Sequence, residues 1–195
     1  RGRSKAREST PVKPVPQAFV DAVVAHVSPQ VATMIRLQEL TGMRPGEVTI
    51  IRTCDLDTSG RIWTYTPASH KTEHHGHERV IYLGPQAQDV VKTWLRTNLQ
   101  EYLFSPAEAE AAHNSKRRQE RKTSLWPSHL KHQAKKRKRN RKLKLRDHYS
   151  VTAYNRAIDH GLAQANKLVE NSDKRIPHWH PHQLRHNAAS CLAGR

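Results

Sequence analysis

The chain has 195 residues, 35% of them hydrophobic, which is enough for one domain with its own core. Its formal net charge of +17 indicates a polyanionic partner, and its two cysteines exclude a disulfide framework and fit a reducing compartment. The sequence contains no apolar run long enough for a membrane span, and its basic N-terminus leads into no signal-peptide core.

Helical spacing dominates the first part of the chain, after a polar and basic leader or linker over residues 1–14. Apolar residues within 19–27 recur at the period of an amphipathic helix. Ser28, followed by a proline, is a typical start of the next helix, and Gly42 suits its end. Pro45 then predicts the start of a further short helix.

A small antiparallel sheet is predicted next. RIWTYTP at 61–67 follows a turn and alternates as a strand does, and RVIYL at 79–83 does the same. We expect HKT at 70–72 to pair with 79–83 across a polar turn, which gives three strands in all. Residues 85–98 return to helical spacing.

One segment makes the chain basic. Residues 116–146 hold 15 Lys and Arg and the single acid Glu120, whereas the rest of the chain holds 19 against 16 acids. The few apolar residues of this segment cannot offset the conformational entropy that the segment would lose on folding. We therefore expect a basic, flexible insertion at about 112–148. Helices are predicted again over 150–169 and from Pro181. The predicted fold class is therefore α+β and mostly helical.

Two motifs in the first half carry side chains suited to phosphate chemistry. TGMRPGEV places Arg44 between a helix end and a new helix start, where it can aim its guanidinium at an oxyanion, with Glu47 positioned to brace it. Lys71, near the expected hairpin turn, can reach a phosphate or a leaving oxygen. Taken alone, each is more often an ordinary surface residue.

The third motif is HQLRH. Helical spacing places His182 and Arg185 on one face, with His186 in a supporting position. An arginine binds non-bridging oxygens bidentately, and a neutral imidazole accepts or donates a proton. Two arginines, a lysine and a histidine without a carboxylate cluster together describe a site that neutralises a phosphodiester without a metal.

In this order (TGMRPGE, a lysine before a VIYL strand, then HQLRH) the sequence resembles the catalytic domain of the tyrosine recombinases, the phage integrase family. The resemblance covers roughly residues 15–110 and 150–193, so we interpret 15–195 as a partial integrase-type catalytic domain with a small three-stranded sheet. Family members cut one DNA strand at a time through a tyrosine, leaving a 3′-phosphotyrosine and a free 5′-hydroxyl. The resemblance therefore implies site-specific DNA recombination or integration with no cofactor, because the covalent link stores the energy.

The resemblance also implies a role for each residue. Arg44 and Arg185 would clamp the non-bridging oxygens, and Lys71 would protonate the leaving 5′-oxygen. His182 would accept the proton of the attacking hydroxyl, and Glu47 would orient the Arg44 region.

The sequence departs from the family at its C-terminal end. The family's further His or Trp and its nucleophilic Tyr follow the HxxR motif, whereas ten residues follow Arg185 here and all five tyrosines precede the motif. We therefore expect a C-terminally incomplete catalytic domain that is inactive without the nucleophile segment. The full-length protein is expected to act as a homo-tetramer on paired sites, in a prokaryotic cytoplasm close to the nucleoid, as part of a mobile genetic element.

The stretch KKRKRNRKLKLR at 135–146 is interpreted as an arm that tracks the phosphates of double-stranded DNA, without a signature for reading sequence. A solvated insertion with incidental affinity for any polyanion is the alternative. The residues assigned to DNA binding are Lys135, Lys136, Arg137, Lys138, Arg139, Arg141 and Lys142.

Other functions stay open at this point. The chain fits a non-catalytic DNA-binding remnant of an integrase, or a general basic nucleic-acid-binding protein in which the motifs are coincidental. A metal-dependent nuclease is the weakest alternative. Histidines at 74–77 and 178–182 suit zinc or copper, but neither stretch has a Cys pair or an HExxH spacing, so no metal site is expected.

Overall fold

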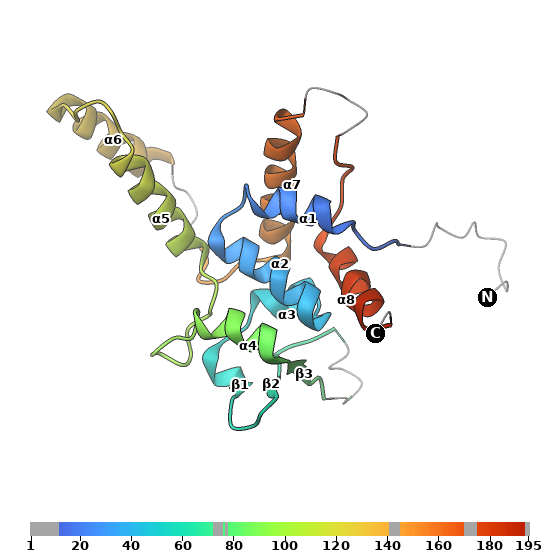
Figure 1. Cartoon of the computed structure of the whole chain (residues 1–195). Coiled ribbons are helices and arrows are strands. Elements are labelled where there is room, and N and C mark those ends of the chain that lie inside the picture. Colours follow the sequence, from blue (N-terminus) through green and yellow to red (C-terminus); the bar gives the residue numbers. More distant parts are fainter. Residues whose placement is uncertain (1–11, 72–75, 77, 141–144, 170–174, 194–195) are drawn as a thin grey trace, which may run out of the picture.

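The computed structural model describes residues 12–71, 76, 78–140, 145–169 and 175–193 (Figure 1). The helices are α1 (Gln17–Val24), α2 (Pro29–Thr41), α3 (Pro45–Thr49), α4 (Pro85–Lys92), α5 (Pro106–Gln119), α6 (Pro127–Asn140), α7 (Val151–Lys167) and α8 (Leu184–Ala193). The strands are β1 (Leu56–Asp57), β2 (Trp63–Tyr65) and β3 (Ile81–Leu83), and short 3-10 turns lie at Thr53–Asp55 and Pro181–Gln183. This confirms the predicted α+β, mostly helical fold class.

Helix α2 begins and ends where the sequence predicted. The Ser28 hydroxyl accepts a hydrogen bond from the Val31 N–H at 3.4 Å, which caps the N-terminus. At the other end, Gly42 takes the left-handed conformation with φ of 66°, and a Cβ added there would lie 3.4 Å from the Ala188 Cβ on α8. The glycine thus ends α2 and lets α8 pack close to it.

The core is organised around α2, which packs against α1, α3, α4, α7, α8 and the sheet (Figure 1). The largest fully buried side chains of the core include Tyr65 on β2, Phe104 before α5 and Tyr154 on α7. Helices α1 and α7 cross closely: a Cβ added at Gly161 would lie 3.1 Å from a methyl group of Val23 on α1 and 2.6 Å from one of Val27, just after α1. A side chain at this position would therefore force the two helices apart.

The sheet is antiparallel with the order β1-β2-β3. The predicted number of strands is right, but one of the three predicted segments is not a strand. The expected strand at 70–72 is wrong: His70 and Lys71 lie outside any strand, and Thr72 lies outside the described residues. Pro67 explains why β2 does not continue toward them, since proline has no N–H to donate to a ladder. The third strand is instead β1, which has two residues and is too short to show alternation.

The basic insertion expected over 112–148 contains two helices, most of α5 and all of α6, which extend away from the core (Figure 1, yellow-green and olive). Lys, Arg, Gln and Ala favour helix, which explains why this composition forms helices without a core. The first turn of α5 is anchored, because Arg96 donates to the Glu108 carboxylate at 2.5 Å. Beyond it, no side chain of α5 is buried, and the described side chains of α6 are exposed. The flexibility of this segment stays a prediction.

Helix α4 ends at Lys92, before the expected end at 98, whereas α7 and α8 lie where the sequence predicted helices. The backbone entering α1 lies beside α8. The Asn187 side-chain amide accepts from the Val15 N–H and donates to the Val15 carbonyl, both at 2.8 Å, and the Gln183 side chain donates to the Lys13 carbonyl at 3.0 Å. Among the described residues, no helix has the length and apolarity to cross a bilayer.

Candidate active site

The structure brings predicted site residues from three distant parts of the sequence together around one pocket. Arg44, Glu47, Lys71 and His182 all line it, and its volume is about 570 Å³. They come from the start of α3, the connection between β2 and β3, and the turn before α8. The pocket is thus formed where these elements meet.

Arg44 is fixed at the N-terminus of α3. Its backbone N–H donates to the Glu47 carboxylate at 2.7 Å, and its guanidinium donates to the other carboxylate oxygen at 2.9 Å. The carboxylate therefore caps the helix and orients the arginine at the same time. The Arg44 side chain stays 26% exposed, so its remaining N–H groups can reach a ligand.

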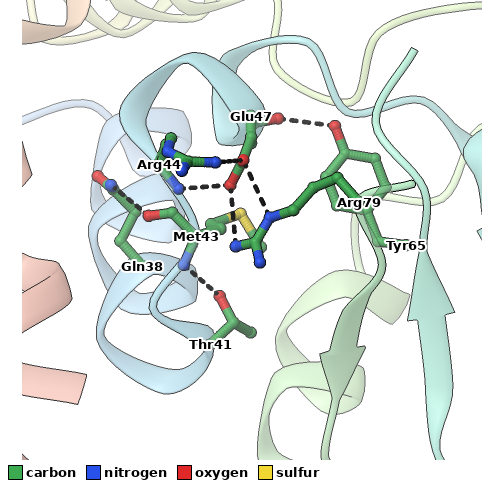
Figure 2. A network of polar contacts seen from close by, with 7 residues as sticks. All are labelled: Gln38, Thr41, Met43, Arg44, Glu47, Tyr65 and Arg79. Carbon is green, nitrogen blue, oxygen red and sulfur yellow. Dashed lines mark hydrogen bonds and ion pairs between the residues drawn. The ribbon is translucent and has the colours of Figure 1, made fainter. Parts of the chain in front are cut away.

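Glu47 is the most connected residue of the site, and its side chain is only 2% exposed (Figure 2). Besides Arg44, Arg79 approaches its carboxylate, with Nε at 3.2 Å and Nη2 at 3.5 Å. Burial alone would raise the pKa of Glu47, but hydrogen bonds from the Arg44 backbone and from both guanidinium groups outweigh it and lower the pKa. Glu47 is therefore ionised at neutral pH.

His182 lies in the 3-10 turn that leads into α8, and Arg185 lies in the first turn of α8. Partial burial of the ring is the largest cause that lowers the pKa of His182, although the residue as a whole is exposed, and the charges of Arg185, His180, His186 and Arg44 add to it. A neutral imidazole at this position suits the predicted proton acceptor.

Arg185 is half-buried and is not among the residues that line the pocket. It lies close enough to the others to feel their charge: burial lowers its pKa, as do the charges of Arg44 and Arg79, while Glu47 opposes the change. Arg44 and Arg79 contact the Glu47 carboxylate, and Arg185 lies within range of their charge, so an anion bound near Arg44 and Arg185 would relieve their mutual repulsion. His186, the next residue, is exposed.

Lys71 is exposed at the pocket and comes directly before the undescribed residues 72–75. The sequence reasoning missed His148, which also lines the pocket. Its Nδ1 lies 2.8 Å from the Asp147 carboxylate, and its ring stacks on Tyr102 with centroids 4.4 Å apart. The sequence signal that could have indicated His148 was its position between the basic segment and Ser150, which caps α7.

Arg79 was also missed, although it begins the RVIYL stretch that was used to predict a strand. Its two contacts with Glu47 place it beside Arg44, and no alternation pattern signals such a contact. The sequence predicted the strand but not the inward direction of its first side chain.

The residues assigned to DNA binding lie apart from the pocket. Lys135 is exposed on α6, which lies far from α8 in Figure 1. The helix continues through Lys136, Arg137, Lys138 and Arg139, whose side chains are not described, and Arg141 and Lys142 lie outside the described residues. Across the described part of the chain, no group of three or more His, Cys, Asp or Glu is arranged to hold a metal ion.

The environments of the five tyrosines differ. Tyr65 and Tyr154 are buried, and their hydroxyls donate to the Glu47 carbonyl at 2.7 Å and to the Gln38 side chain at 2.9 Å. Tyr82 is 68% exposed on β3. Tyr149 is the one tyrosine of the five that lines the pocket, and burial raises the pKa of its hydroxyl, which hydrogen-bonds to the Ser28 side chain.

The family model of the phage integrase family matches residues 17–195 of this chain. The chain belongs to the phage integrase family. Among solved structures, it is similar to the XerA recombinase, with a TM-score of 0.51 and 16% identity, over 98% of this chain and 52% of that one. That likeness supports the integrase catalytic fold. A comparison with curated proteins gave no match.

A second solved structure, the XerH site-specific recombinase bound to its difH substrate in a pre-cleavage complex, aligns with a TM-score of 0.48 and 14% identity, over 96% of this chain and 44% of that one. This integrase-family chain thus spans about half the length of the two recombinases. Proteins of the phage integrase family are tyrosine recombinases, which are enzymes of DNA recombination and integration.

Proposed function

We propose that this integrase-family protein performs site-specific recombination of double-stranded DNA by cutting and rejoining strands through a 3′-phosphotyrosine. The observation that supports it most is the convergence of Arg44, Lys71 and His182 on one pocket, with Arg185 close enough to Arg44 to be repelled by its charge. These four residues come from three segments that are distant in sequence, and together they supply two anion clamps, a proton donor and a proton acceptor.

Each of the four has one step in the proposed reaction. Arg44 and Arg185 bind the non-bridging oxygens and stabilise the charge that builds up at phosphorus. His182 takes the proton from the attacking tyrosine hydroxyl while the phosphorus–oxygen bond forms. Lys71 gives a proton to the 5′-oxygen as the old bond breaks. Glu47 orients Arg44 and carries no proton in this scheme, because its pKa is lowered.

We assign the nucleophile to none of the five tyrosines. Tyr65 and Tyr154 are buried with their hydroxyls engaged, Tyr82 is exposed on β3, and Tyr102 packs against His148 without lining the pocket. Tyr149 lines the pocket, but burial raises the pKa of its hydroxyl and outweighs the lowering by Ser28. We therefore propose that these 195 residues alone bind DNA without cutting it.

A nicked suicide substrate tests this proposal, because it traps the covalent intermediate on a denaturing gel. The full-length protein should form a DNA adduct, and Arg44→Ala and Arg185→Ala should each reduce its rate at least a hundredfold, the typical effect of removing one transition-state donor. Arg36→Ala is the control, since Arg36 pairs with Asp21 and Glu39 outside the site. Wild-type rates for both site variants would reject the assignment.

The isolated 195-residue chain provides the complementary test. We expect tight binding to the same substrate without an adduct. An adduct that Tyr149→Phe abolishes would instead identify Tyr149 as the nucleophile. A protein that binds DNA but forms no adduct at either length would favour the non-catalytic remnant.

We also propose that the basic arm at 135–146 binds DNA phosphates. Replacing Lys135, Arg139, Arg141 and Lys142 with glutamine should lower the slope of log K against log salt by about 0.9 for each phosphate that the arm no longer neutralises. A matched control replaces Lys116, Arg117, Arg118 and Arg121, which carry the same charge on and after α5. Equal slopes for the two sets would indicate incidental affinity for polyanions. The proposed homo-tetramer on paired sites is tested by cross-linking with and without DNA.

A further inference from the structure

The connection that carries Lys71 is tied to α3 on both sides. On β2, before Lys71, the Tyr65 hydroxyl donates to the Glu47 carbonyl at 2.7 Å. Just before β3, after Lys71, Arg79 donates to the Glu47 carboxylate through Nε and Nη2. A single residue of the Arg44 helix thus holds the segments on either side of Lys71 (Figure 2).

The charge of Glu47 is shared between two arginines. Arg44 and Arg79 both contact Oε1, at 2.9 and 3.2 Å, so neither guanidinium has the carboxylate to itself. With Arg44 as its only partner, a carboxylate that is 2% exposed would largely cancel the charge that Arg44 needs for a phosphate. Arg79 is the second cation that leaves the group with a net positive charge.

Arg79 is itself less suited to direct contact with the reacting phosphate. Its side chain is 30% exposed, but it is not among the residues that line the pocket, and two of its three guanidinium nitrogens face Glu47. Its fork, rather than its charge alone, matches the two oxygens of a carboxylate, which a lysine cannot do.

We propose that Arg79 is a positioning residue of the recombination site: through Glu47 it fixes Arg44 relative to the Lys71 connection and keeps the Arg44 charge available for a phosphate. This inference rests on the proposed function. Arg79 therefore acts on DNA binding only through Arg44, and that dependence can be measured.

The test measures the affinity of the chain for duplex DNA as a function of salt, for Arg79→Gln, Arg44→Ala and the double variant. Arg79→Gln should bind about five- to tenfold more weakly, the size of effect seen in coupled polar networks. Its salt slope should equal that of wild type, because the same number of phosphates is neutralised, whereas Arg44→Ala should lower the slope by about 0.9. The double variant should bind no more weakly than Arg44→Ala alone.

Arg36→Gln is the matched control, because it removes one charge from an ion-paired arginine outside the site, and its affinity should change less than twofold. Circular dichroism checks that each variant is folded. If Arg79→Gln is not, Arg79→Lys takes its place: it keeps the charge without the fork and should still lose affinity at an unchanged slope.

The other outcomes overturn the inference. Wild-type affinity for the Arg79 variant shows that the fork is not needed. A lowered slope, or a loss that adds in full to that of Arg44→Ala, shows that Arg79 binds a phosphate itself. If Arg44→Ala retains both affinity and salt slope, the proposed function fails together with the inference. If only Arg44→Ala loses affinity and Arg79→Gln does not, the role of Arg79 is rejected and the proposed function stands.

Discussion

Replacing Glu47 with glutamine should destabilise the fold by about 2–3 kcal/mol at pH 7. The carboxylate accepts four hydrogen bonds, from the Arg44 backbone, from the Arg44 guanidinium and two from Arg79, at 2.7 to 3.5 Å. Glutamine keeps one accepting oxygen and turns an N–H donor toward other donors. Hydrogen bonds to charged groups contribute about 1.5–3 kcal/mol each. The expected loss is well below the sum of these bonds, because glutamine keeps one acceptor and both arginines are partly exposed and regain water.

The effect should depend on pH in a defined direction. The pKa of Glu47 is lower in the folded protein than in the unfolded chain, where it is about 4.3. Its stabilising contribution is therefore fully present above that value and is lost as the pH falls through the lowered folded pKa. Urea unfolding followed by tryptophan fluorescence, at pH 7 and at several values below 4.5, measures the difference between wild type and variant.

Glu39→Gln is an internal control with the opposite expected sign. Glu39 also pairs with an arginine three residues away, Arg36, but burial is the largest cause of its shift and raises its pKa. Its ionised form therefore costs stability at pH 7, and its Oε1 is buried without a hydrogen-bond partner among the described residues. Glu39→Gln should be neutral or stabilising at pH 7, with the difference vanishing in acid. A Glu47→Gln variant within about 0.5 kcal/mol of wild type, or equal effects at both sites, would refute this reasoning.

Three further predictions concern the fold around the site. Gly161→Ala should lose about 1–3 kcal/mol by urea unfolding, because the new Cβ would lie 3.1 Å from Val23 on α1 and 2.6 Å from Val27; a gain in stability would show that this contact relaxes easily. Tyr65→Phe should lose about 1–2 kcal/mol, since it leaves the Glu47 carbonyl without its buried donor, and an unchanged midpoint would contradict that. His182→Gln should remove a rise in stability with pH: the lowered pKa of His182 makes wild type gain stability from its folded pKa up to about 6.5, so parallel curves for the two proteins would count against the shift.

The elements predicted best from the sequence are those with local signals. The Ser28 cap and Gly42 set the ends of α2 because capping depends on neighbouring residues and on one backbone angle. The sheet was predicted less well. Strand β1 has two residues, and its pairing with β2 is a tertiary contact that no short pattern records. The basic insertion forms helices because backbone propensity needs no core, and apolar content alone does not measure that propensity.

The candidate site divides in the same way. Arg44, Lys71, His182 and Arg185 were identified because their motifs are short and ordered along the chain, and the structure places the first three on one pocket. Their catalytic roles stay a proposal. Arg79 could not be identified in this way, because its importance lies in the direction of one side chain that reaches Glu47 from another element.

The pairing of Asn187 with both backbone groups of Val15 has a mechanical consequence. Asn187 lies two residues after Arg185 on the same helix, so the segment entering α1 is hydrogen-bonded to the helix that carries Arg185. The side chain of Val15 is also buried in the core, so residues 13–15 are held to α8 both by these two hydrogen bonds and by packing. The helix that carries Arg185 is therefore anchored in part by a stretch of backbone from the opposite end of the sequence.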